Sequence, residues 1–183
     1  MICPSCSGSQ VRALEGPYHF KESGLDWIYL VGLPHGVCET CGDEVVALPN
    51  PELLFDLIAR VILERKRPLH GSEIRFLRDL IGWTQARLAT EIGKGRVAIA
   101  RWESGEKQVP PQTDVMMRVV WLHAYLEQKR ENRLGVLTEE SLRLLSDWTY
   151  KIGAVMREMR HTAPGKESIS IDVGTRQVVT TSC

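Results

Sequence analysis

The sequence predicts an α+β fold, in which a small N-terminal β unit precedes a longer series of helices. Two observations support the β unit: Cys-x-x-Cys pairs occur at residues 3–6 and 38–41, and two aromatic, β-favouring runs, PYHFK and DWIYLVG, lie between them. The helices follow from apolar residues that recur at three- and four-residue spacing in several later stretches. The expected segments are residues 1–48, 49–71, 72–132 and 133–183, the last a C-terminal helix and tail.

The paired cysteines have the spacing of a metal site formed by Cys3, Cys6, Cys38 and Cys41. Each pair lies at a turn, so its two sulfurs can reach one tetrahedral ion, and four thiolates leave no open coordination position. This indicates structural zinc. Disulfides are rare in a reducing cytosol, and neither pair has the strand–helix setting of a redox motif. Residues 1–48 are therefore predicted to be a zinc ribbon with a β-hairpin that turns near Gly24.

Three other residues with metal-binding or thiol chemistry need an interpretation. His19 and His35 lie between the cysteine pairs and could replace a ligand. Four cysteines make this unnecessary, so we interpret both histidines as surface or hairpin residues. Cys183 ends the sequence and is expected to be a free thiol.

Two helices are predicted before the central part of the chain. PNPE at residues 49–52 indicates the start of the first. RKRPLHGS at residues 65–72 is typical of a linker or loop, and Ser72 is the expected N-cap of the second. The apolar stripes are Leu54, Leu57, Ile58, Val61 and Ile62 in the first helix, and Ile74, Leu77 and Ile81 in the second.

Residues 82–105, GWTQARLATEIGKGRVAIARWESG, predict two short helices joined by a glycine-bearing turn. Thr84 is the expected N-cap of the first helix, and the second begins near Arg96 after Gly93-Lys94-Gly95. Two helices joined in this way form a helix-turn-helix. A further helix follows QVPPQTD, and one side of it contains Met116, Val119, Val120, His123 and Leu126.

Charge is unevenly distributed, although the formal net charge is zero. Residues 1–59 carry −6, residues 60–107 carry +5 and residues 108–183 carry +1. A basic middle segment fits a surface that binds a polyanion, and chance clustering on a solvated face is the alternative. No Ser/His/Asp set, open His-rich metal site or phosphate loop is present, so no enzyme is predicted. The apolar runs are too short to span a bilayer and MICPSCSG lacks the features of a secretory signal, so a cytoplasmic location is expected.

The segment TQARLATEIGKGRVAIARWESG resembles the Xre-type helix-turn-helix, whose pattern is roughly TQxxLAxxxGVSxxxIxRWExG. Together with the cysteine pairs, residues 1–128 resemble the MqsA family of antitoxins, also called YgiT-type proteins. This resemblance implies an autoregulating type II antitoxin: a repressor with structural zinc that has operator DNA as partner and a cognate toxin protein as a second candidate partner. The matching motif positions are Thr84, Gln85, Leu88, Ala89, Gly93, Ile99, Arg101, Trp102, Glu103 and Gly105.

The second helix of such a motif lies in the major groove, which assigns roles to its outward residues. Arg96 and Arg101 are the expected base-reading residues, because arginine donates two bonds to guanine. Val97 stands where the MqsA family has Asn, and it can contact only a thymine methyl group. Gln85 resembles the family's phosphate-contacting position, beside the Thr84 cap, while Glu103 is expected to be structural. Phosphate contacts are also expected from Lys94 and Lys107.

One unit of this size contacts too few base pairs for genomic selectivity, which favours a homodimer on a palindrome. The candidate dimer elements are the helix near residues 112–132 and an apolar stripe further on, for which intramolecular core is the alternative. That stripe contains Leu142, Leu145, Trp148, Ile152, Met156 and Met159. ESISIDVGTRQVVTTSC, at the end, is expected to form a terminal hairpin or a flexible tail.

The sequence is compatible with three functions for the whole chain. The leading hypothesis is a DNA-binding transcriptional regulator with a structural zinc ribbon. The alternative is a protein–protein adaptor in which the ribbon and the C-terminal helix bind a partner without specific DNA binding. A redox or metal-dependent enzyme is the third, and no motif supports it.

Overall fold

The computed structural model describes residues 2–48, 50–132, 150, 168–175 and 177–180. The chain forms two compact units, one of residues 1–57 with 165–183 and one of residues 58–164. Mixed strands and helices confirm the predicted α+β class. Cys183 and the expected apolar stripe of residues 142–159 lie outside the described residues.

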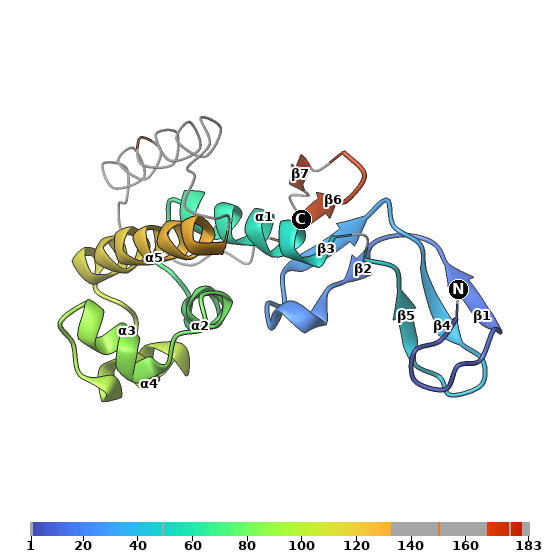
Figure 1. Cartoon of the computed structure of the whole chain (residues 1–183), viewed down its shortest axis with the longest axis horizontal. Coiled ribbons are helices and arrows are strands. Elements are labelled where there is room, and N and C mark those ends of the chain that lie inside the picture. The colour runs from blue at the N-terminus through green and yellow to red at the C-terminus, as the bar shows by residue number, and fades with distance from the viewer. Residues whose placement is uncertain (1, 49, 133–149, 151–167, 176, 181–183) are drawn as a thin grey trace. The chain divides into compact units, whose positions relative to one another are not determined.

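The first unit contains a three-stranded antiparallel sheet that positions the cysteines (Figure 1). Its order is β1 (Val11–Leu14), β4 (His35–Cys38) and β5 (Glu44–Val46). Val11 pairs with Cys38 and His35 with Val46. Gly36 lies against β1, where a Cβ atom would overlap the carbonyl oxygen of Arg12. Glycine at this position therefore allows β4 to approach β1 closely.

A second, four-stranded sheet brings the end of the chain into the first unit. Its order is β2 (Tyr18–His19), β3 (Ile28–Val31), β6 (Ile169–Asp172) and β7 (Gln177–Thr180). A 3₁₀ turn, η1 (Lys21–Ser23), and Gly24 with φ +69° connect β2 to β3. This confirms the predicted hairpin and its turn. The fully buried residues of this sheet and its turn are Phe20, Leu25, Ile28, Leu30 and Ile171.

Residues 169–180 form the terminal hairpin that the sequence allowed, but its sheet partner was not predicted. β6 runs parallel to β3, with Ile28 opposite Ile169 and Leu30 opposite Ile171. The first unit is therefore built from both ends of the chain and is not confined to residues 1–48.

The second unit is helical, and α1 (Pro51–Glu64) spans the boundary between the two units. After it come α2 (Gly71–Leu80), α3 (Gln85–Glu91), α4 (Arg96–Glu103) and α5 (Pro111–Asn132). α4 packs against α2 and α3 (Figure 1). Helices α1, α3 and α4 begin where predicted. At the start of α1, Asn50 Oδ1 accepts from Leu53 N at 3.1 Å, and at the start of α3, Thr84 Oγ1 accepts from Arg87 N at 3.1 Å.

The N-cap of α2 is His70, so the expectation of Ser72 is wrong. The side chain of His70 accepts from the backbone N–H of Glu73, and Glu73 Oε2 accepts from the backbone N–H of His70 at 2.9 Å. This reciprocal pair is a capping box, which satisfies two backbone donors at the helix start. Ser72 is exposed within the first turn.

The loop after α1 is an ordered structural element. Glu73 is fully buried and pairs with Arg65 at 3.0 Å and with Arg67 at 2.7 Å. Arg118 of α5 is also fully buried and donates to four backbone carbonyl oxygens at 2.7–3.1 Å. These carbonyls belong to Ile62, Leu63, Arg65 and Arg67. Arg118 thereby satisfies the C-terminal end of α1, which has no intrahelical partners of its own.

The buried side of α5 is not the side with Met116, Val119 and His123, all three of which are exposed. A neighbouring stripe packs inward instead. Its buried apolar residues are Met117, Trp121, Leu122 and Tyr125.

Candidate nucleic-acid interface and metal centre

α4 presents one face to the core and a different set of side chains to solvent, as predicted. Ile99 is fully buried and Trp102 is 7% exposed. Val97 is 66% exposed, and Arg96 and Arg101 are exposed beside it. Ala89 of α3 is buried, and its small side chain lets α3 and α4 pack closely.

A buried carboxylate fixes the C-terminal end of α4. Glu103 has a fully buried side chain and accepts from Arg78 Nε at 2.6 Å and from Gln85 Nε2 at 2.8 Å. Arg78 also donates to the carbonyl oxygen of Trp83 at 2.8 Å. The hydrogen bonds that Arg78 donates to the Glu103 carboxylate raise the pKa of Arg78 above its usual value. Glu103 is therefore structural, as expected, and one Gln85 N–H is engaged inside the unit.

The contact between α2 and α4 depends on a glycine. Gly71 is the first residue of α2, and a Cβ atom there would overlap the carbonyl oxygens of Trp102 and Glu103. The last turn of α4 thus lies directly against the first turn of α2. Sequence reasoning placed Gly71 in a loop, and its local sequence carries no signal of a contact thirty residues away.

Two groups can be distinguished among the basic residues of the middle segment. Arg65, Arg67 and Arg78 are engaged in internal ion pairs. The second group consists of Lys94, Arg96 and Lys107, whose side chains are exposed. Among the described residues, none of these three has an ion-pair partner. Internal pairing therefore leaves a smaller set of free cations than the sequence suggests.

Arg101 belongs to neither group. Its Nε lies 3.2 Å from Glu106 Oε1, and the two side chains are 47% and 58% exposed. Exposed pairs of this kind contribute at most about 1 kcal/mol, so a phosphate or base edge can replace Glu106 as the partner of Arg101.

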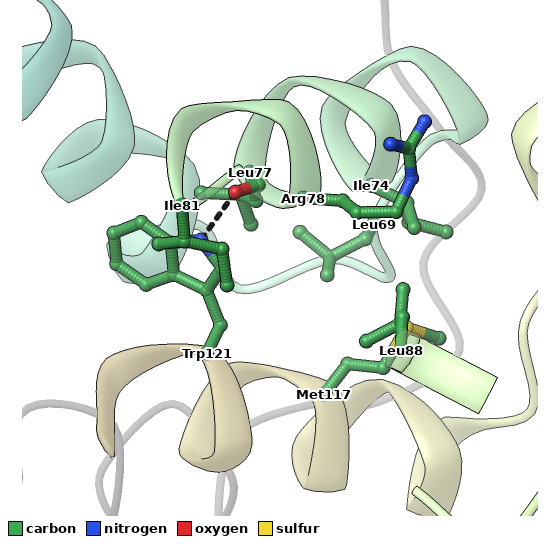
Figure 2. A pocket seen from close by; sticks show the side chains of 8 residues that line it. All are labelled: Leu69, Ile74, Leu77, Arg78, Ile81, Leu88, Met117 and Trp121. Carbon is green, nitrogen blue, oxygen red and sulfur yellow. Dashed lines mark hydrogen bonds between the residues drawn. The ribbon is translucent and has the colours of Figure 1, made fainter. Parts of the chain in front are cut away.

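The core beneath the motif is closed. Figure 2 shows side chains from α2, α3 and α5 around a cavity of about 10 Å³, across which Trp121 Nε1 donates to the carbonyl oxygen of Leu77 at 2.5 Å. Such a volume barely holds one water molecule. A cavity of this size has no room for a ligand larger than a water molecule. Its lining residues are Leu69, Ile74, Leu77, Arg78, Ile81, Leu88, Met117 and Trp121.

The four predicted cysteines meet in the first unit. Cys3 Sγ lies 3.6 Å from Cys41 Sγ, Cys6 Sγ lies 3.5 Å from Cys38 Sγ, and all four sulfurs lie within 4.8 Å of one another. A regular tetrahedron with metal–sulfur bonds near 2.3 Å has sulfur–sulfur distances of about 3.8 Å. The cluster therefore has the dimensions of a four-thiolate metal site.

Backbone amides and crowding act on the four thiols in opposite directions. The N–H groups of Cys41 and then Thr40 outweigh burial and lower the pKa of Cys38 to about 6. At Cys41 the N–H of Asp43 favours the thiolate, but burial and the three neighbouring sulfurs outweigh it and raise the pKa to about 12. Four sulfurs this close need a cation to be thiolates together, so the donor set fits a metal ion.

The two histidines take no part in this cluster, which consists of cysteines alone among the described residues. Both lie in hairpin strands, as the sequence allowed. His19, in β2, is stacked on Tyr29 with ring centroids 4.9 Å apart, and His35, in β4, is buried. His35 is therefore not a surface residue.

This geometry defines a chain with a helix-turn-helix domain and a four-cysteine cluster able to hold a metal ion. Residues 74–116 match the helix-turn-helix family model, a span that includes α3 and α4. The match supports a DNA-binding regulator. Neither the curated proteins nor the solved structures gave a match. In the described part of the chain, every helix is too short or too polar to cross a bilayer.

Proposed function

We propose that this chain is a sequence-specific DNA-binding transcriptional regulator that inserts α4 into the major groove. The observation that carries this proposal is the division of α4. Its inner face and C-terminal end are fixed by Ile99, Trp102 and Glu103, while Arg96 and Arg101 project into solvent. Base edges are read by such outward side chains on a rigid helix.

Phosphate contacts are assigned to groups around the two ends of the motif. Lys94 lies in the turn before α4 and Lys107 lies just after it, and both are exposed. Thr84 and the second N–H of Gln85 lie at the start of α3. Contacts of this kind position the protein on the duplex and make binding depend on salt.

The first unit has a separate role in this proposal. Its four cysteines hold structural zinc, because a closed set of four thiolates suits that ion. Residues 1–59 carry a net charge of −6, which does not favour contact with DNA. The first unit is therefore assigned to stability and to protein contacts, and DNA binding to the second.

The finer class we propose is an autoregulating antitoxin of the MqsA type, acting as a cytoplasmic homodimer without catalysis. Support comes from the order of a four-cysteine unit and a helix-turn-helix in one chain. The exposed side of α5 with Met116 and Val119 supplies an apolar surface for dimerisation. A toxin partner would bind the protein outside the DNA-reading face.

The test is a gel-shift titration on the DNA upstream of the protein's own coding sequence, with a scrambled duplex as control. Specific binding supports the regulator. Equal binding to both duplexes, or none, favours the protein–protein adaptor. The antitoxin class has its own test: expression of a small neighbouring open reading frame should stop growth, and co-expression of this chain should restore it.

A further inference from the structure

The outward face of α4 combines arginine and small aliphatic side chains. Its side chains are Arg96, Val97, Ala100 and Arg101, in a helix whose full sequence is RVAIARWE. Val97 and Arg101 are one turn apart on the same face, with Ala100 beside them. Two arginines therefore stand on either side of a patch made only of aliphatic carbon.

This face can donate hydrogen bonds but cannot accept them. The one side-chain acceptor in α4 is Glu103, which is 6% exposed and held by Arg78 and Gln85. Reading cytosine N4 requires an acceptor, and reading adenine bidentately requires both a donor and an acceptor. α4 provides neither function on its outward face. Of the acceptors left to its arginines, only guanine offers two side by side, O6 and N7, for a bidentate contact, and its aliphatic side chains can contact the methyl group of thymine.

The exposure of Val97 indicates which of these features it reads. The side chain is 66% exposed, so the fold of the free protein does not use it as core. An aliphatic side chain at the start of a recognition helix gains free energy when it and another apolar group remove each other's surface from water. In the major groove that group is the thymine methyl.

Resting on the DNA-binding function proposed above, we infer that α4 recognises a thymine methyl group through Val97, next to guanine read by its arginines. Val97 is then a specificity-determining residue that measures the C5 substituent of a pyrimidine. The operator half-site is defined by a methyl contact as well as by hydrogen bonds. The same contact would accept 5-methylcytosine in place of thymine, because the methyl group occupies the same position in the groove.

The experiment uses the full chain and the best duplex found by in vitro selection, with each thymine replaced in turn by deoxyuridine. One thymine in each half-site should weaken binding about fourfold when its methyl group is removed, the effect of losing one buried methyl group. A C·G pair at that position should also bind weakly, and 5-methylcytosine there should restore part of the affinity. In Val97→Ala, the difference between thymine and deoxyuridine should disappear.

Val179→Ala is the matched control, because Val179 is also an exposed valine but lies on β7 of the first unit. It should keep the full deoxyuridine effect. Specific binding that is insensitive to deoxyuridine at every position would overturn the inference and leave the regulator intact. A deoxyuridine effect that persists in Val97→Ala would also overturn it, since another residue would then contact the methyl group. Absence of any sequence preference in the selection would refute the regulator itself and the inference with it.

Discussion

Replacing Arg118 by methionine should destabilise the helical unit more than any other single arginine replacement. Arg118 is fully buried, pairs with Asp114 at 2.9 Å and donates to four carbonyl oxygens of α1 and the loop that follows. Asp114 itself accepts from Leu69 N at 2.7 Å, so it would remain buried without its charged partner. Breaking a buried pair in this way costs about 3–5 kcal/mol, against a typical total stability of about 5–15 kcal/mol.

The assay is urea unfolding followed by far-ultraviolet circular dichroism, because the described helices α2–α5 all belong to the second unit. Arg96→Met is the control: its side chain is exposed and has no ion-pair partner among the described residues, so the change should stay within about 0.5 kcal/mol. Asp114→Leu with Arg118→Met should lose less than the two single variants together, since neither charge is then left alone. A loss below about 1 kcal/mol for Arg118→Met would refute its role at the end of α1.

Three further predictions follow from the cysteines, the α2–α4 contact and the α2 cap. Cys38→Ser should abolish metal binding and unfold the three-stranded sheet while leaving α2–α5 helical, because a structural zinc site supplies about 10–16 kcal/mol of folding free energy; one equivalent of metal retained in the purified variant would contradict this. Gly71→Ala should displace α4 and weaken specific DNA binding, whereas Gly95→Ala, where a Cβ atom meets nothing within 4 Å, is the control; equal DNA affinities for the two variants would count against it. Burial, and then the charge of Arg67, hold the pKa of His70 in the folded protein below its usual 6.5. The unfolded chain therefore binds this proton at a higher pH, and the free energy of unfolding falls as the pH drops from about 6.5 toward the folded pKa. Urea titrations should show this loss in the wild type and not in His70→Ala, and an identical pH dependence in both would contradict it.

Local patterns predicted what depends on local chemistry. The spacing of the cysteines anticipated the cluster, and the motif residues anticipated the cap at Thr84 and the start of α4. Each of these features is set by residues within a few positions or by a repeated pair. The Ser72 error is of the same kind, because serine is the commoner cap and only Glu73 at the third helical position favours His70.

Contacts between segments far apart in the chain could not be predicted from local sequence patterns. β6 pairs with β3 across more than 130 residues, and neither strand's sequence indicates which strand is its partner. RKR at residues 65–67 has the composition of a solvated loop, yet Arg65 and Arg67 are buried and form ion pairs with Glu73. Burial of a charge is decided by a partner in space, so these positions could be assigned only from the structure.

The central claim, that α4 reads bases, is tested most directly by comparing Arg101→Ala with Lys94→Ala. Binding isotherms are measured for both on cognate and scrambled duplexes at several salt concentrations. Arg101→Ala should cost about 1–3 kcal/mol on the cognate duplex and little on the scrambled one. Lys94→Ala should weaken both alike and reduce the magnitude of the log–log salt slope by about one. Equal weakening of both duplexes by Arg101→Ala would contradict the claim, because the arginine would then be a phosphate contact.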